Sequence, residues 1–117
     1  MNDAEKRNFI INVTKALKML GVNIGARGYD YTKDALILIA ESDALSRYGS
    51  IQLYQMVADK YSESSVSKVE RSIRNFVSNA FNEGNSFYTK AIGITDKKPS
   101  NSHFLKAMSE YLKYNNV

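Results

Sequence analysis

The sequence has no cysteine, which excludes disulfides, thiolate metal sites and a cysteine nucleophile. Its single histidine, His103, cannot build a metal site that needs several histidines. The longest apolar run, residues 35–40, is far shorter than the roughly 18–20 residues of a membrane-spanning helix. Charges scattered through residues 3–18 exclude the apolar core of a secretory signal peptide. We therefore expect a cytoplasmic protein with no membrane partner, no metal and no cofactor.

What the sequence does contain is enough apolar material for one domain. The chain has 117 residues, of which 44% are hydrophobic and 24% charged, so a buried core is expected rather than disorder. The net charge of +4 permits a polyanionic partner without requiring one. We expect a single domain over residues 1–117, because one domain usually takes roughly 100–200 residues.

Apolar residues recur with helical spacing, and no segment shows the sustained alternation of a half-buried strand. Asn2 or Asp3 can cap a first helix, and Gly21 can end it. The apolar stripe of this helix consists of Phe9, Ile10, Val13, Ala16, Leu17 and Leu20. Residues 21–28 carry three glycines without the pattern of a phosphate-binding loop, so we expect a connecting turn.

Five more helices complete the predicted fold. We expect helices over residues 31–42, 51–61, 65–83 and 86–92, and a last helix near the C-terminus. Ser50 can cap the helix over 51–61, and Ser100 or Asn101 can cap the last one. The run 36–39 is also compatible with a buried strand, but it would lack a partner strand. The inner face of the third helix is Leu53, Tyr54, Val57, Ala58 and Tyr61. The expected fold class is all-α, a compact six-helix domain.

The predicted helix over residues 65–83 divides into two faces when residues are placed about 100° apart. Its apolar face consists of Val66, Val69, Ile73, Phe76, Val77 and Ala80. Its polar face consists of Ser67, Lys68, Arg71, Arg74, Asn75, Ser78 and Asn82, with Glu70 at the edge. The polar face thus carries three cations and several short hydrogen-bonding side chains.

These residue types suit the major groove of DNA. Arginine bonds guanine bidentately, asparagine bonds adenine, and a carboxylate accepts from cytosine. Serine and lysine hold phosphates without reading sequence. A solvated helix face explains the same residues, because Glu70 and Arg74 form a favourable i, i+4 pair worth about 0.2–0.5 kcal/mol. A protein interface is the third interpretation, and residue types alone leave all three open.

Four ordered blocks resemble one family, the C-terminal DNA-binding domain of stage-zero sporulation protein A, a sporulation response regulator. The most specific block is the Val-Glu-Arg-Ser-Ile-Arg segment at residues 69–74. The other blocks are Gly21-Val22 followed by Arg27-Gly28-Tyr29, Tyr31 and Ala35; Gly49-Ser50-Ile51 followed by Leu53-Tyr54, Ala58, Lys60 and Tyr61; and Lys98-Pro99-Ser100-Asn101-Ser102 followed by Phe104. The resemblance covers roughly residues 10–112.

The resemblance implies a helix-turn-helix at about residues 51–83, formed by 51–61 and 65–83. It implies a transcription regulator rather than an enzyme, with no catalytic residue. The receiver domain of such a response regulator would need roughly 100 further residues, so we expect no receiver domain in this chain. Its partners would be promoter boxes in double-stranded DNA, RNA polymerase, and a second copy of the chain on tandem sites. The base-reading positions of the family fall on Lys68, Glu70 and Arg71, and its DNA-proximal positions fall on Ser67, Arg74 and Asn75.

The sequence departs from the family at three places. Lys68 stands where the family has arginine, and lysine lacks the bidentate fork. The turn between the two motif helices, residues 62–66, is one residue longer than usual, and the connection before Pro99 is shorter. These departures support an alternative function, a helical protein-interaction module that modulates a full-length relative without binding DNA.

Overall fold

The computed structural model describes residues 1–23, 25–62 and 64–117, and these residues form helices without any strand. The helices are α1 (Asp3–Met19), α2 (Arg27–Ser42), α3 (Ala44–Ala58), α4 (Val66–Glu83), α5 (Ser86–Ile92) and α6 (Asn101–Tyr114). The predicted all-α fold of six helices is confirmed. No helix in the described ranges is both long and apolar enough to cross a membrane.

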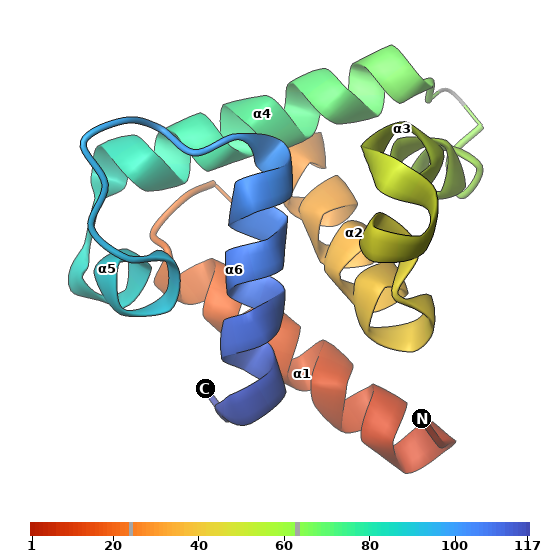
Figure 1. Ribbon diagram of the computed structural model, residues 1–117, viewed down its shortest axis with the longest axis horizontal. Coiled ribbons are helices and arrows are strands. Elements are labelled where there is room, and N and C mark those ends of the chain that lie inside the picture. Colours follow the sequence, from red (N-terminus) through yellow and green to blue (C-terminus); the bar gives the residue numbers. More distant parts are fainter. Residues whose placement is uncertain (24, 63) are drawn as a thin grey trace.

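The helices are arranged around α2, which packs against α1, α3, α4 and α6. In Figure 1, α4 runs along the top of the molecule and α1 along the bottom, with α6 crossing in front between them and α3 on the right. The run 36–39, which was also compatible with a strand, lies inside α2, and its Leu36 is fully buried. A helix is favoured here because a central helix buries apolar residues on several sides.

Local capping groups end several helices, and the cap at Asn2 is one of the two that were predicted for the first helix. Asn2 and Glu5 form a capping box at the start of α1, in which each side chain accepts a hydrogen bond from the other residue's backbone amide. Ser65 accepts from the backbone amide of Lys68 at the start of α4, and Gly84 ends α4 with a left-handed φ of 52°. The first and last turns of α4 are therefore fixed by local chemistry.

The start of α2 differs from the prediction. The helix begins at Arg27 rather than at residue 31, so the last part of the predicted turn over residues 21–28 is helical. The reason is packing against α4, because a Cβ built on Gly28 would lie only 2.5 Å from the backbone oxygen of Ser72. Only glycine allows this close approach, and the contact outweighs its poor helix propensity of about 1 kcal/mol.

The start of α3 also differs. Residues 44–48 are already helical, whereas the prediction began the helix after Ser50. Gly49 has φ 82° and ψ 172°, which kinks the helix, and helical geometry resumes directly after it. The predicted segment is thus the second half of a bent helix.

The end of α3 lies earlier than predicted. The helix ends at Ala58, and the backbone amides of Lys60 and Tyr61 then bond to carbonyls three residues back, in a tighter turn. Tyr61, predicted on the inner face of the third helix, therefore lies beyond its end. Val66, predicted on the apolar face of the helix over residues 65–83, is the first residue of α4. The connection between α3 and α4 is therefore residues 59–65 rather than 62–66.

Candidate nucleic-acid interface

The buried face of α4 holds this helix on the core. Val69, Ile73, Val77 and Ala80 are fully buried, and Phe76 is 4% exposed. These residues belong to the predicted apolar face. The remaining member of that face, Val66, is half-buried against the core. The rotation of α4 about its axis is therefore as predicted.

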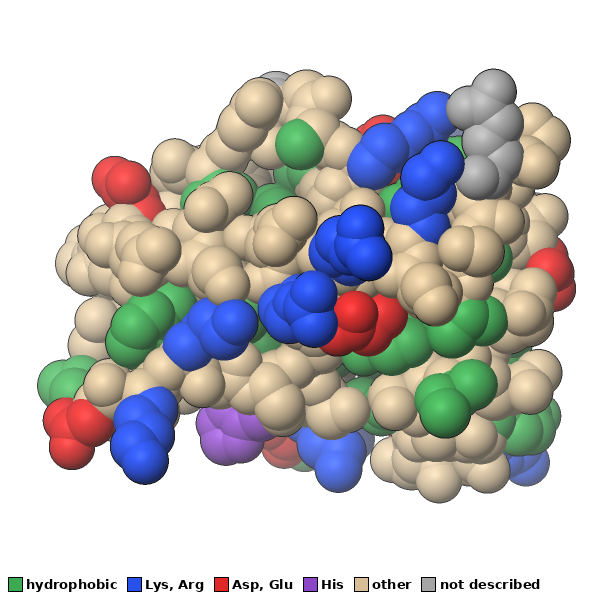
Figure 2. All heavy atoms as spheres, turned by 90° about the horizontal axis from the view of Figure 1, so that it is seen from above, with side chains coloured by type: hydrophobic (Ala, Val, Ile, Leu, Met, Phe, Trp, Pro, Cys, Tyr) green, Lys and Arg blue, Asp and Glu red, His purple; other side chains and the backbone are tan. Residues whose placement is uncertain are grey.

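The opposite face of α4 is open to solvent. Its exposed residues include Ser67, Lys68, Arg71, Arg74 and Asn75, and Glu70 is half-buried at the edge. All six candidate DNA-contacting residues thus lie on or beside one surface. Figure 2 shows this side of the molecule, on which lysine and arginine side chains form a broken band. Their contacts with DNA stay a prediction.

One ion pair lies within this surface. The guanidinium of Arg74 is 3.2 Å from the carboxylate of Glu70, with side-chain exposures of 50% and 37%. At such exposure an i, i+4 pair contributes about 0.3–0.5 kcal/mol, so either partner can be recruited by a ligand at small cost. The pair therefore orients both side chains in the free protein rather than locking them.

The polar face of α4 borders a groove on each side. The first groove has a volume of about 820 Å³ and is lined by the second half of α3, by α4 and by the start of α6 with its preceding loop. It includes Ser67, Glu70, Arg71 and Arg74. The second groove, about 510 Å³, is lined by cationic residues that include Arg27, Lys60 and Lys68. Cations thus line both flanks of α4.

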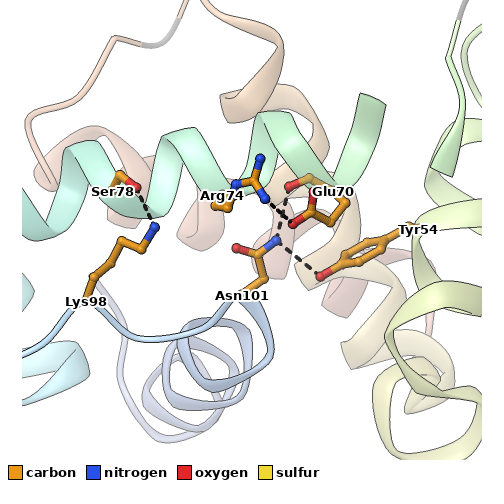
Figure 3. A network of polar contacts seen from close by, with 6 residues as sticks. All are labelled: Tyr54, Glu70, Arg74, Ser78, Lys98 and Asn101. Carbon is orange, nitrogen blue, oxygen red and sulfur yellow. Dashed lines mark hydrogen bonds and ion pairs between the residues drawn. The ribbon is translucent and has the colours of Figure 1, made fainter. Parts of the chain in front are cut away.

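Asn101 joins three helices beneath the first groove. Its side-chain amide donates hydrogen bonds to the backbone oxygen of Glu70, at 3.1 Å, and to the hydroxyl of Tyr54, at 3.2 Å (Figure 3). Burial raises the pKa of Tyr54, so its hydroxyl stays protonated at neutral pH. The sequence predicted Asn101 only as a possible cap of the sixth helix, but Ser100 is the cap.

Lys98 reaches α4 from the loop between α5 and α6. Its ammonium donates a hydrogen bond to the hydroxyl of Ser78 at 2.9 Å (Figure 3). The sequence gave no reason to place this loop beside α4. This contact joins residues 20 positions apart.

The turn between α3 and α4 is held on α2. The hydroxyl of Tyr61 donates to the carboxylate of Asp34, and the ring of Tyr61 meets that of Tyr31 edge-on at 5.1 Å. The guanidinium of Arg27 lies 4.9 Å from the centre of the Tyr61 ring. Burial, followed by the hydrogen bond to Asp34, raises the pKa of Tyr61. The hydroxyl of Tyr31 also bonds that of Ser64, so the turn directly before α4 is fixed by side chains of α2.

The acidic side chains near this surface are few among the described residues. Among residues 1–23, 25–62 and 64–117, no three histidine, aspartate or glutamate side chains gather as a metal site would require. The only acidic side chain lining the first groove in the described chain is that of Glu70, and it pairs with Arg74. The site is an exposed helix face bordered by cations.

Comparison with known families gives one match. The family model described as "Sporulation initiation factor Spo0A C terminal" matches residues 13–112, nearly the whole chain. It confirms the resemblance found on the four sequence blocks. The family is a DNA-binding transcription-factor domain and not an enzyme family, which confirms that prediction too.

Proposed function

The chain belongs to the family of Spo0A C-terminal domains, and on this premise we propose that it reads promoter boxes in double-stranded DNA through α4. Family membership makes it a DNA-binding domain concerned with transcription and sporulation. The proposal adds how the duplex is bound and which residues discriminate its sequence. The observation that carries it is the exposed polar face of α4, held at a fixed rotation by its buried face.

Three residues of this face are the proposed base readers. Arg71 can bond the O6 and N7 atoms of guanine as a fork, and Lys68 can bond the same edge as a point charge. Glu70 can accept from the amino group of cytosine. The exposure of Lys68 and Arg71, next to the half-buried Glu70, supports this assignment. An α-helix fits the width of the major groove, so the first two turns of α4 would meet the bases.

Ser67, Arg74 and Asn75 are the proposed contacts to the sugar-phosphate backbone or to nearby base edges. They are exposed beside the base readers. Phosphate contacts fix the register of a protein on the duplex and carry most of the salt-dependent affinity. The cationic residues along both flanks of α4 support this part of the proposal, because both strands border the major groove.

The remaining proposals concern organisation. We propose that the chain is one effector domain, that its helix-turn-helix lies at about residues 51–83, and that it acts in the cytoplasm. We also propose that two copies bind tandem boxes and that RNA polymerase is a partner. The family resemblance supports each of these proposals.

Selection of bound duplexes from a random pool tests the proposed function. We expect one enriched box, and a mobility-shift assay at 50 and 200 mM salt should then show the box retained over a scrambled duplex of equal length. Retention of both duplexes alike would contradict base reading. No shift even at 50 mM salt would contradict DNA binding and favour the alternative, an interaction module that acts on a full-length relative.

A further inference from the structure

The cations of α4 itself end halfway along the helix. The exposed polar face carries Lys68, Arg71 and Arg74 in its first half, and from residue 75 to Glu83 α4 has no lysine or arginine. Ser78 lies four residues after Arg74, which places the two side chains on neighbouring turns of the same face. The second half of α4 therefore provides hydrogen-bonding groups without positive charge.

Lys98 supplies a positive charge at this position from another part of the chain. Its ammonium lies 2.9 Å from the hydroxyl of Ser78, and its side chain is exposed. In Figure 3 the side chain of Lys98 extends from the loop up to α4, where Arg74 and Glu70 lie farther along the same helix. The line of cations on α4 is thus continued by a lysine from the loop before α6.

The backbone of Lys98 is held in place by its neighbours. The following residue, Pro99, is buried and restricts Lys98 to extended conformations. The next residue, Ser100, caps α6 by accepting from the backbone amide of His103 at 3.1 Å. Before Lys98, the backbone oxygen of Lys97 accepts from the hydroxyl of Thr95 at 2.9 Å. The lysine therefore extends from an anchored segment.

We infer that Lys98, docked on Ser78, binds a backbone phosphate of the duplex next to the bases read by α4. This inference rests on the proposed function and adds the loop of residues 94–99 to the binding surface. An ammonium that donates one hydrogen bond to a serine hydroxyl still has two further N–H donors for a phosphate oxygen. The loop contains one acid, Asp96, and two lysines, so its own charge stays positive.

Charge relocation tests the inference. Lys98→Ala should weaken binding to the selected box and to scrambled duplex alike, by about five- to tenfold at 0.1 M salt, because one counterion release is lost. The slope of log K against log salt should become about one unit shallower. Adding Ser78→Lys to Lys98→Ala should restore both affinity and slope, since it returns a cation to the same place from α4.

Lys113→Ala is the matched control, because Lys113 is an exposed lysine at the other end of α6. It should change neither affinity nor slope, and thermal melts should show all variants folded. An unchanged slope for Lys98→Ala, while Arg71→Ala still relaxes the preference at one base pair, overturns the inference and leaves the proposed function standing. A weaker affinity that Ser78→Lys does not restore also overturns it. A wild-type chain that binds no duplex overturns both.

Discussion

The side-chain amide of Asn101 donates a hydrogen bond to the backbone oxygen of Glu70, at 3.1 Å and across 31 positions of sequence. The backbone of Glu70 is thereby tied to the start of α6, while its carboxylate lies beside Arg74 on the exposed face of α4. The same amide bonds Tyr54 of α3. One side chain thus connects both helices of the proposed helix-turn-helix to α6.

Asn101→Ala should destabilise the protein by about 1–3 kcal/mol. The substitution removes both hydrogen bonds and leaves the side chain of Tyr54, which is buried, without this donor. Urea unfolding followed by circular dichroism measures the loss. Asn116→Ala is the control, because Asn116 is exposed beyond the end of α6, and it should change stability by less than about 0.5 kcal/mol. Equal stability of the two variants would contradict the bracing role.

Gly28→Ala should move α2 away from α4. The added Cβ would lie 2.5 Å from the backbone oxygen of Ser72 and 3.1 Å from the Cβ of Phe76, and neither atom can rotate away. We expect a net loss of about 1–2 kcal/mol, since overpacking exceeds the helix-propensity gain of alanine. In Gly25→Ala the new Cβ meets only the side-chain oxygen of Asn23 at 3.2 Å, so this control should be nearly neutral. A Gly28→Ala variant that is more stable than the wild type would contradict a tight contact between α2 and α4.

Local patterns predicted the features of α4 that matter most for its proposed role. The rotation of the helix follows from the 3.6-residue period of its apolar residues, and the predicted range 65–83 differs from α4 only in its first residue, Ser65, which is the cap. These signals lie within the helix or next to it, so the sequence displays them directly. Exposure of the candidate DNA-contacting residues followed from the same pattern.

Features that depend on distant contacts could not be predicted in this way. The inclusion of Gly28 in α2 depends on the backbone of α4, and glycine alone indicates a turn. The positions of Asn101 and Lys98 depend on how α6 and its preceding loop pack onto α4. A kink at Gly49 likewise leaves no trace in hydrophobic periodicity, because residues on both sides of it remain helical.

Arg71→Ala should cost about 1–3 kcal/mol of binding free energy on the selected box and relax preference at one base pair. The reason is loss of a bidentate contact that only the correct base can satisfy. Competition mobility shifts with boxes altered one position at a time measure this relaxation. Equal losses on selected and scrambled duplexes would assign Arg71 to the backbone instead.

Arg74→Ala should weaken binding to selected and scrambled duplexes alike, and should make the salt slope about one unit shallower. The protein itself should lose at most about 0.5 kcal/mol of stability, because the pair of Arg74 with Glu70 is exposed. Titration of affinity over 50–200 mM salt distinguishes this outcome from base reading. A changed base preference with an unchanged slope would reverse the assignment.

Tyr61→Phe tests the attachment of the turn before α4 through the pH dependence of stability. At pH 7 the variant loses the hydrogen bond from the tyrosine hydroxyl to Asp34, at a cost of about 1.5 kcal/mol. Burial and Asp34 raise the pKa of Tyr61 in the folded state above the ordinary value of about 10. The stabilisation from this shift is therefore complete below pH 10 and is lost as pH rises toward the folded pKa.

Above pH 10 the wild type should lose stability more steeply than Tyr61→Phe, by at most about 1.4 kcal/mol per pH unit. Urea unfolding of both proteins between pH 7 and 11 measures the difference, because the two proteins share every other side chain. Tyr48→Phe is the matched control, since Tyr48 is 52% exposed, and it should leave the pH profile of the wild type unchanged. Parallel profiles for wild type and Tyr61→Phe would mean that the turn is not held through this hydroxyl, and that the orientation of α4 depends on its buried face alone.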